Sequence, residues 1–338
     1  MISYSSWAFV SVSFLVVLCL AFSGVALCSV LYLVGAKWRQ DVRQLATSLF
    51  ALFPLAFVML IVLLVGGLFT FPWIGHTAHG ENLHMPGWYT LPLLAAREII
   101  GMLAVMYLSW LFIKRQDLSE RSAEDAARFH TIATWIPFFY VLYGTMVAWD
   151  FEMTLKPSWH SAIYGMQVIV SNFGLFLGFM TIWIYVLNTR DKLVTPIKDY
   201  IYNYMAQMLL AFTLLWMYTF FAQYLTIWYG NIGDEVDRVL GMQNGDYSVL
   251  WWMTVFLKFV IPFVVLSFPG PRHSPTVILG IAGGIILGTI CERYTWIAGI
   301  DGTGDIPVLW GALVAAVVGF IGYILVGGAM RRNHLIKG

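Results

Sequence analysis

The sequence predicts an all-α, polytopic membrane protein with about nine transmembrane helices. Of the 338 residues, 60% are hydrophobic and only 11% are charged, whereas about a quarter of the residues of a soluble domain are charged. The chain also divides into apolar stretches of ~20 residues, the length of helix that crosses the hydrocarbon core of a bilayer. A net charge of +1 and the lack of a Lys/Arg-rich run argue against a nucleic-acid partner.

We expect the whole chain, residues 1–338, to form a single integral membrane domain. The first apolar stretch has no basic residues before it and is too long for a cleavable signal peptide, so it predicts a retained first span. The eighth stretch contains Glu292 and Arg293, which makes its outer end the least sharply marked. The predicted spans are 7–34, 45–70, 91–113, 128–149, 162–187, 203–228, 249–268, 276–299 and 307–329.

The basic residues between these stretches predict the orientation of the chain. Fourteen Lys and Arg residues lie after spans one, three, five and seven or in the C-terminal tail, and the opposite connections hold only Lys156 and Arg238. The other three, Arg97, Lys258 and Arg293, lie within spans. By the positive-inside rule, the N-terminus is predicted to lie outside and the C-terminus in the cytoplasm.

Cysteine and histidine positions argue against a redox centre held by this chain. The three cysteines lie in apolar stretches without a C-x-x-C pair, which excludes a Cys-ligated iron–sulfur or zinc site. The seven histidines lie in loops, at span ends or in the tail, whereas a transmembrane b-type haem needs axial histidines inside paired helices. We therefore expect no cofactor bound covalently or by ligation. The alternative is a metal site from the loop histidines His76, His79 and His84.

Small residues at intervals of four predict close helix packing in the last two spans. These residues are Gly280, Gly284 and Gly288 in span eight, and Gly311, Ala315 and Gly319 in span nine. Glu292 continues the first series, so we expect its side chain to point into a tight helix contact. Because the neighbouring Arg293 points in another direction on a helix, we do not expect these two residues to neutralise each other.

Several polar side chains at membrane depth are candidates for function, because each ionisable group there costs ~2.5–3.5 kcal/mol on insertion scales. The spacing also places polar residues on one face of a helix in spans four and five. The faces are Tyr140, Tyr143, Val147 and Asp150 in span four, and His160, Tyr164, Gln167 and Ser171 in span five.

These residues favour either a polar route for protons or a site for a quinone headgroup. The alternative is interhelical hydrogen bonding that only stabilises the bundle, which we favour for the Asn, Gln and Ser residues. For Lys258 and Glu292 we favour function, since a buried charge is a poor stabiliser. The outer candidates are Asp150, Glu152, His160, Tyr164, Arg97, Glu98, Gln223 and Glu292; those near the middle are Lys258, Tyr143, Gln167 and Asn172; the cytoplasmic ones are His130, Asn203, Gln207 and Asp199.

Two stretches resemble a known family. Residues 150–165, DFEMTLKPSWHSAIYG, and 209–235, LLAFTLLWMYTFFAQYLTIWYGNIGDE, resemble successive signatures of the ActF subunit of alternative complex III, which belongs to the NrfD-like, polysulfide-reductase membrane-subunit group. GAKWRQDVRQ at 35–44 and FPWIG at 71–75 fit its earlier turns. Ser158 stands where the family has histidine, Lys156 where it has an acidic residue, and nine spans are predicted where the family usually has ten.

The resemblance implies NrfD-like packed helix bundles in a bacterial cytoplasmic membrane and a cofactor-free subunit of a quinol:electron-acceptor oxidoreductase of the cytochrome c type. The implied partners are lipids, an NrfD-like sister subunit, an iron–sulfur subunit and a multihaem cytochrome c, with haem c and the clusters on those partners. The subunit would give structural support and, as a further expectation, a proton-translocation path. It would not be an enzyme by itself.

Two alternative functions are also compatible with the sequence. In the first, this chain binds the quinol itself, with Asp150, His160 and Tyr164 around the headgroup. In the second it is a secondary transporter, although no pair of Gly/Pro-interrupted helices stands at corresponding positions in two halves.

Overall fold

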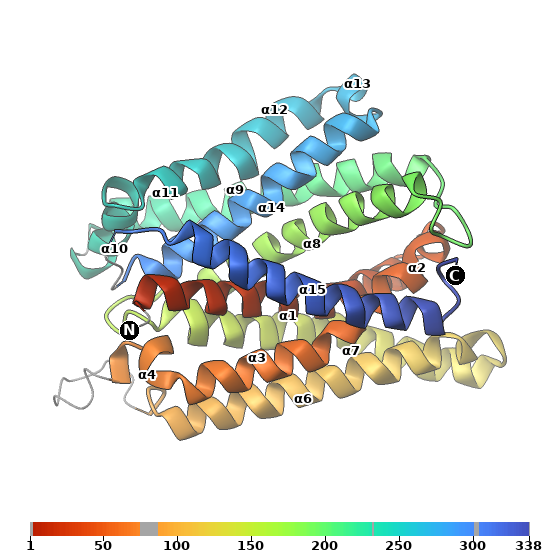
Figure 1. Ribbon diagram of the computed structural model, residues 1–338, viewed down its shortest axis with the longest axis horizontal. Coiled ribbons are helices and arrows are strands. Elements are labelled where there is room, and N and C mark those ends of the chain that lie inside the picture. The colour runs from red at the N-terminus through yellow and green to blue at the C-terminus, as the bar shows by residue number, and fades with distance from the viewer. Residues whose placement is uncertain (1–2, 75–86, 232, 301–303, 338) are drawn as a thin grey trace.

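The computed structural model describes residues 3–74, 87–231, 233–300 and 304–337, and it is almost entirely helical there (Figure 1). In the described ranges, the nearest feature to a strand is an isolated bridge between Leu193 and Ile336. Nine helices of these ranges are long and apolar enough to cross a membrane. The predicted all-α, polytopic membrane fold is confirmed.

All nine predicted spans correspond to helices whose ends lie within a few residues of the predicted ones. The candidate membrane-spanning segments are Tyr4–Leu33, Arg39–Val65, Leu91–Gln116, Ala123–Met153, Tyr164–Thr189, Tyr200–Gly230, Ser248–Ser267, Pro275–Ala298 and Val308–Arg332.

Six of these spans are single, unbroken α-helices, and the other three are assembled from shorter elements. The elements are α1 (Tyr4–Leu33), α2 (Arg39–Ser48), η1 (Leu49–Leu52), α3 (Phe53–Val65), α4 (Gly67–Thr70), α6 (Leu91–Gln116), η2 (Leu118–Glu120), α7 (Ala123–Ala148), η3 (Trp149–Met153), α8 (Tyr164–Thr189), α9 (Tyr200–Gly230), α10 (Gly233–Asn244), α11 (Ser248–Val255), η4 (Phe256–Val260), α12 (Ile261–Ser267), α13 (Pro269–Arg272), α14 (Pro275–Ala298) and α15 (Val308–Arg332).

Local sequence signals explain several helix ends. Ser122 caps α7 by accepting a hydrogen bond from the Asp125 backbone N–H, which satisfies one of the free N–H groups of the first turn. α3 ends before Gly66, where an added Cβ would lie 2.5 Å from the Trp7 ring. α9 ends at Asn231, whose φ of 47° is the left-handed conformation that terminates many helices.

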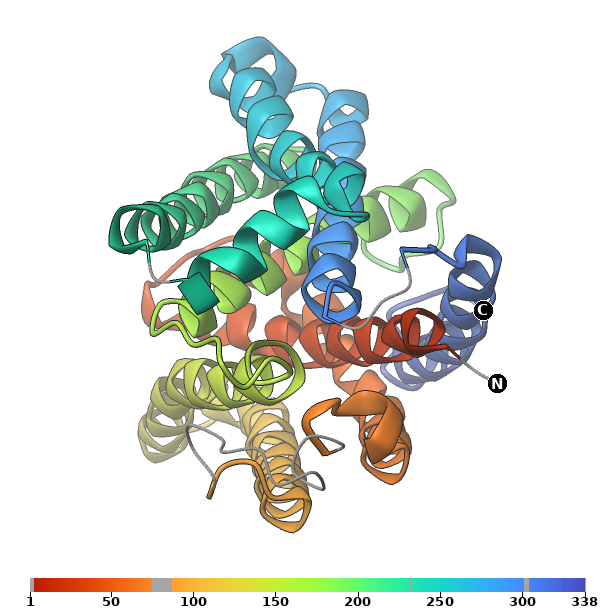
Figure 2. The ribbon, with the colours of Figure 1, turned by 90° about the vertical axis from the view of Figure 1, so that its left-hand side faces the viewer.

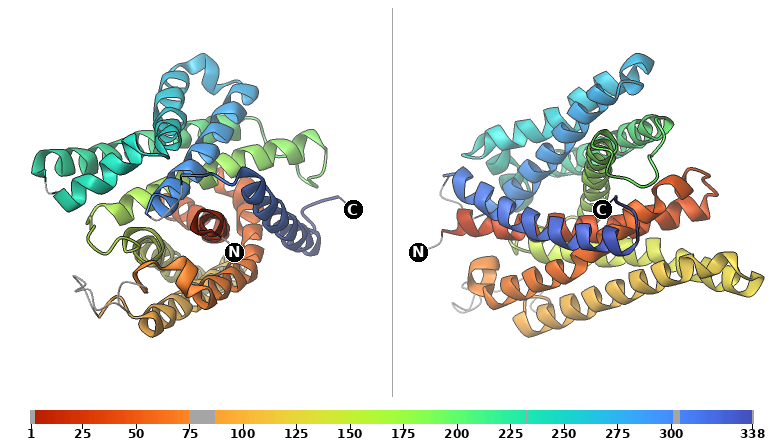
Figure 3. Two further views of the ribbon diagram at one scale, coloured as in Figure 1. Left: turned by 60° about the vertical axis from the view of Figure 1, so that its left-hand side comes forward. Right: turned by 45° about the vertical axis from the view of Figure 1, so that its right-hand side comes forward.

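α1 lies near the centre of the molecule, with helices from both halves of the chain around it (Figures 2 and 3). Of the most apolar stretch of this helix, 89% is buried, against 11% for the last span, α15. α1 packs against α3 and α7 on one side and against α8, α14 and α15 on others. It therefore joins a group formed by α3, α6 and α7 to a second group formed by α8, α9, α11, α12 and α14.

Small residues allow close packing of the last two spans at some of the predicted positions but not at others. A Cβ added to Gly288 would lie 2.7 Å from the Lys258 side chain, and one added to Gly311 would lie 2.5 Å from the Phe9 ring. At Gly280 and Gly319, by contrast, an added Cβ would meet no atom within 4 Å. The prediction of close packing is confirmed at Gly288 and Gly311 and is wrong at Gly280 and Gly319.

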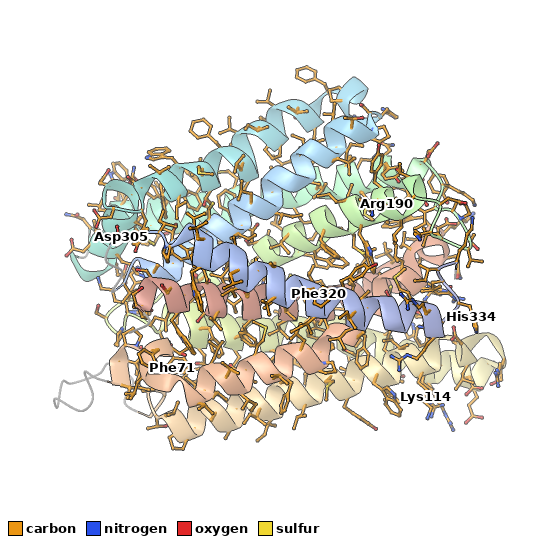
Figure 4. All side chains as sticks on the ribbon, in the orientation of Figure 1. Phe71, Lys114, Arg190, Asp305, Phe320 and His334 are labelled. Carbon is orange, nitrogen blue, oxygen red and sulfur yellow. The ribbon has the colours of Figure 1, made fainter. Side chains whose placement is uncertain are left out.

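The two termini lie at opposite ends of the bundle (Figure 1), as an odd number of spans requires. Lys114 and His334 lie at the C-terminal end of the molecule, and Phe71 and Asp305 lie at the other end (Figure 4). We call the end with the N-terminus the outer end, following the orientation that the loop charges predict.

Candidate functional site

Two π-helical segments carry buried charges. η3 extends α7 through Trp149–Met153 and contains Asp150 and Glu152, and η4 interrupts the seventh span at Phe256–Val260 around Lys258. A π turn accommodates an extra residue within a helix and is frequent at functional sites. It also changes the direction of the side chains that follow, so these charges lie elsewhere than on an ideal α-helix.

Lys258 and Glu292 form an ion pair inside the second helix group, where both side chains are nearly inaccessible. The Ser171 hydroxyl donates to Glu292 Oε2 at 2.5 Å and accepts from Lys258 Nζ at 2.5 Å. The other carboxylate oxygen, Oε1, accepts from Trp216 Nε1 at 3.0 Å and from Gln167 Nε2 at 3.2 Å. Both oxygens of Glu292 are therefore hydrogen-bonded, which a buried carboxylate requires.

Arg293 connects this pair to a second buried acid. Its Nη1 donates to Glu152 Oε2 at 2.6 Å, and the Tyr164 hydroxyl donates to the same oxygen. Its Nη2 donates to Asn172 Oδ1 at 3.3 Å and lies 4.0 Å from Glu292 Oε2. Glu292 and Arg293 were not expected to neutralise each other, and each has a closer ionic partner, Lys258 and Glu152 respectively, although the Arg293 guanidinium also comes within 4.0 Å of Glu292.

Asp150 faces a different cation at the outer end. Arg97 Nε donates to Asp150 Oδ2 and Nη2 donates to Oδ1, both at 2.6 Å, in the two-bond geometry that favours arginine over lysine. Trp88 Nε1 donates to Asp150 Oδ1 at 2.9 Å, and the guanidinium lies 4.0 Å from the centre of the Trp88 ring. The Arg97 side chain is 12% exposed, so this pair marks the outer boundary of the buried charges.

Glu98 differs from the other three buried acids. It is fully buried beside Asp150 and the Tyr143 hydroxyl, but neither of its carboxylate oxygens has a hydrogen bond to a described residue. The Tyr143 hydroxyl instead donates to the Glu98 backbone oxygen at 3.5 Å.

Arg238, from the outer helix α10, holds the π-helical segment η3 in place. Its guanidinium donates to the backbone oxygens of Met153 at 2.9 Å, Glu152 at 2.8 Å and Trp296 at 3.2 Å. It also lies over the Trp159 and Trp296 rings, 4.7 and 4.8 Å from their centres. Burial lowers the pKa of Arg238 to about 10, so this cation still carries its charge at neutral pH.

The structure brings together most of the predicted outer and middle residues. Lys258 and Glu292 were expected at different depths, but they are in contact. His160, however, precedes α8 and is exposed, so the prediction that it shares a helical face with Tyr164 is wrong. Gln223 is buried nearby, where its Oε1 accepts from the Ser161 hydroxyl at 3.3 Å.

The predicted cytoplasmic residues do not form a comparable cluster. His130, Asp199 and Gln207 are exposed, and Asn203 is half-buried with a buried Oδ1 that accepts no hydrogen bond from the described residues. In the inner parts of α8, α9 and α14, the buried side chains are mainly apolar. The described polar network therefore extends from the outer end to the middle of the bundle.

The cavities next to this network are small. One of about 30 Å³ is lined by Tyr143 and Asn172, and one of about 10 Å³ is lined by Glu292 and Trp296. A cavity of ~10–15 Å³ can hold a single water molecule. Both volumes suit water and are far too small for a quinone headgroup.

Five contributors to the network were not among the predicted site residues: Arg293, Arg238, Trp88, Trp216 and Ser171. Ser171 was placed on the correct helical face but was interpreted as a bundle contact. The sequence did offer an indication of Arg293, because this residue is one of only three basic residues within the predicted spans. Arg238 and Trp88 lie in outer connections, where the sequence does not show which residues fold back into the bundle.

No group of three or more potential metal ligands occurs among the residues that the structure describes. The three loop histidines considered as a metal site, His76, His79 and His84, lie outside the described residues.

The fold and the buried charges define the class of this protein as an all-α, multi-pass membrane protein with an ionic network in the outer half of its helix bundle. Comparison with protein-family models and with curated proteins finds no match.

Proposed function

We propose that this chain is a transmembrane subunit of a quinol:electron-acceptor oxidoreductase of the alternative complex III type, in a bacterial cytoplasmic membrane. Its resemblance to ActF at 150–165 and 209–235 supports this assignment. In this proposal, the quinone, iron–sulfur clusters and haem c are bound by partner subunits, and this chain has a structural role and takes part in proton movement.

The observation that carries the proton role is the connection of two buried acids through one arginine. Arg293 lies 2.6 Å from Glu152 Oε2 and 4.0 Å from Glu292 Oε2, and Glu292 pairs in turn with Lys258. Lys258 is ten residues from the outer end of its span at Ser248, or ~15 Å at 1.5 Å per residue, which is half of a ~30 Å hydrocarbon core. Arg293 keeps its own proton; its role in this proposal is to hold the two acids close together and to tune their proton affinity, which an exchange of protons between them requires.

The direction of this route follows from where the polar groups are found. They extend from the middle of the bundle toward Asp150 and Arg97 at the outer end, and the inner half offers mostly apolar side chains. The proposed role is therefore release of protons from the middle of the membrane to the outer face, with single waters in the adjoining cavities completing the contacts.

The alternative in which this chain binds the quinol headgroup receives less support. Of the three residues expected around the headgroup, Asp150 is bound by Arg97 and Trp88, Tyr164 is bound to Glu152, and His160 is exposed off the helix. The two small cavities of the network, of about 30 and 10 Å³, are lined by neither Asp150 nor Tyr164 and are too small for a headgroup.

The first test is purification of the full chain from its native membrane in mild detergent. We expect subunits with c-type haem and iron–sulfur clusters to co-purify, with quinol oxidation in the same fraction. Purification of the chain without any redox partner would contradict the proposed complex.

The second test measures protons released at the outer face per electron in the reconstituted complex. Lys258→Met and Glu292→Gln should lower this ratio while electron transfer continues, and Lys114→Gln, which removes an exposed inner cation, should leave it unchanged. The double variant Lys258→Met/Glu292→Gln removes both charges together and so separates loss of the route from loss of folding. An unchanged ratio in all variants that assemble would contradict the proton role.

A further inference from the structure

α15 stands away from the rest of the bundle along much of its length. It packs against α1, η1 and α2, and Gly311 contacts Phe9 at one end. Between α15 and the helices α8 and α14 lies a cavity of about 1170 Å³, which extends from Val308 to Arg331. Gly319 and Gly327 line this cavity, and an added Cβ at either position would meet no atom within 4 Å.

The walls of this groove are almost entirely apolar. α1 contributes Val12 and Val16, α8 contributes Trp183, α14 contributes Leu287, and α15 contributes Val318 and Val326. A groove of this composition favours hydrocarbon, and its lining residues follow α15, a candidate membrane span, along most of its length.

One end of the groove is strongly basic. Arg190, Lys192, Arg331 and Lys337 all line it there and are exposed. The C-terminal tail is held beside the turn after α8, because the Lys337 N–H donates to the Lys192 backbone oxygen at 2.8 Å and Leu193 forms a bridge with Ile336. This pairing brings together cations from two segments that are far apart in the sequence.

The positive charge of this end is only partly compensated. Asp191 accepts from Lys337 Nζ at 2.6 Å, whereas Arg190, Lys192 and Arg331 have no ion pair with a described residue. Both segments belong to the loops and tail that the charge distribution predicts to be cytoplasmic. Cytoplasmic leaflets carry anionic lipids, and basic pockets between transmembrane helices on this side bind their headgroups.

We infer that this groove is a binding site for an anionic phospholipid of the cytoplasmic leaflet. The lipid phosphate lies at Arg190, Lys192 and Arg331, and the acyl chains lie between α15 and the helices α1, α8 and α14. Guanidinium groups suit phosphate because they donate two parallel hydrogen bonds to its oxygens. The lipid would then occupy the space that the small residues of α15 leave open and attach this helix to the bundle. The inference is independent of the proposed function.

The test uses the full chain, purified in mild detergent, with phosphatidylglycerol as the probe. Native mass spectrometry should show one retained phosphatidylglycerol, and added phosphatidylglycerol should raise the thermal unfolding temperature more than phosphatidylcholine does. Glycerol phosphate, which has the headgroup chemistry without acyl chains, should not reproduce the effect. An equal response to phosphatidylcholine or to glycerol phosphate would overturn the inference.

Two variants examine the two parts of the site separately. Arg190→Gln/Lys192→Gln/Arg331→Gln should weaken phosphatidylglycerol retention at least about tenfold, because it removes three of the cations that attract the anionic headgroup. The matched control Lys37→Gln/Lys114→Gln/Arg121→Gln removes three exposed cations from other loops of the same side and should retain the lipid.

Gly319→Leu tests the apolar part. Because an added Cβ meets open space at this position, the variant should fold, fill the groove and lose the lipid with the basic end intact. Retention of the lipid by both variants, or a quinone or a partner helix found in the groove in its place, would contradict the inference.

Discussion

The outer and inner halves of the second helix group are held together by different forces. In the outer half, α8 and α14 meet through Glu292, Gln167 and Ser171, and α14 meets η3 through Arg293 and Glu152. In the inner half, the same two helices pack closely through small and apolar residues, since a Cβ added to Gly178 would lie 2.9 Å from the Ala282 backbone oxygen and 3.3 Å from Ile286. One helix pair thus combines directional ionic contacts at one end with apolar packing at the other.

The difference is informative because the two kinds of contact have different costs. Within a bilayer the apolar contacts need only good packing, since lipid is as apolar as the side chains. Buried ion pairs lose hydration, and well-packed apolar residues often stabilise a protein as well or better. A network of this kind in one half alone is therefore better explained by function than by stability.

The largest expected effect is on the outer half. Arg293→Met leaves Glu152 without its cation and should destabilise the protein by about 3–5 kcal/mol, the range for breaking a buried pair. Thermal unfolding of the purified chain measures this change. Arg293→Met/Glu152→Gln should recover part of the loss, and Arg128→Met, at an exposed ion pair, should cost less than about 1 kcal/mol. Equal effects at Arg293 and Arg128 would show that the outer network is not buried.

A smaller effect is expected from an apolar truncation in the inner half. Leu177→Ala should destabilise the protein by about 2 kcal/mol, at the low end of the range for buried leucines. Arg293 donates to the Val168 backbone oxygen on α8, and Leu177 lies nine residues further along the same helix, or ~13.5 Å at 1.5 Å per residue. The double variant should therefore show additive losses of unfolding free energy. Strong non-additivity would show that the two halves are coupled.

Arg97→Gln should lower the free energy of unfolding by about 1.5 kcal/mol, the low end of the range for hydrogen bonds to charged groups, because the side chain is 12% exposed. Asp150→Asn in the same background should reduce the loss, since the uncompensated charge is removed. The measurement is again thermal unfolding. If the loss of unfolding free energy in the double variant equals the sum of the losses in the two single variants, the two residues do not interact.

The smallest effect is expected at the predicted inner polar residues. Gln207→Ala and Asp199→Ala remove exposed side chains and should each change the unfolding free energy by less than about 0.5 kcal/mol. Both should also leave the ratio of protons to electrons unchanged in the complex. A large loss from either would indicate an inner polar route that the contacts do not suggest.

The sequence was sufficient to predict the nine spans, because each needs a long apolar stretch and leaves an unmistakable pattern. It also identified Lys258 and Glu292 as buried, since charges within such stretches are rare. It did not reveal the π-helical turns at Asp150 and Lys258, which depend on local packing rather than composition. It also did not reveal that Arg238 reaches η3 from an outer helix, because such long-range contacts have no local pattern.

The ionised pair of Lys258 and Glu292, enclosed by protein in the middle of the membrane, is tested most directly by infrared spectroscopy. The difference spectrum between the wild-type chain and Glu292→Gln should show the loss of a carboxylate band at neutral pH. In the Lys258→Met background, the same substitution should remove a protonated carboxyl band. Loss of a protonated carboxyl band in the wild-type background would contradict the ion pair at the centre of the network.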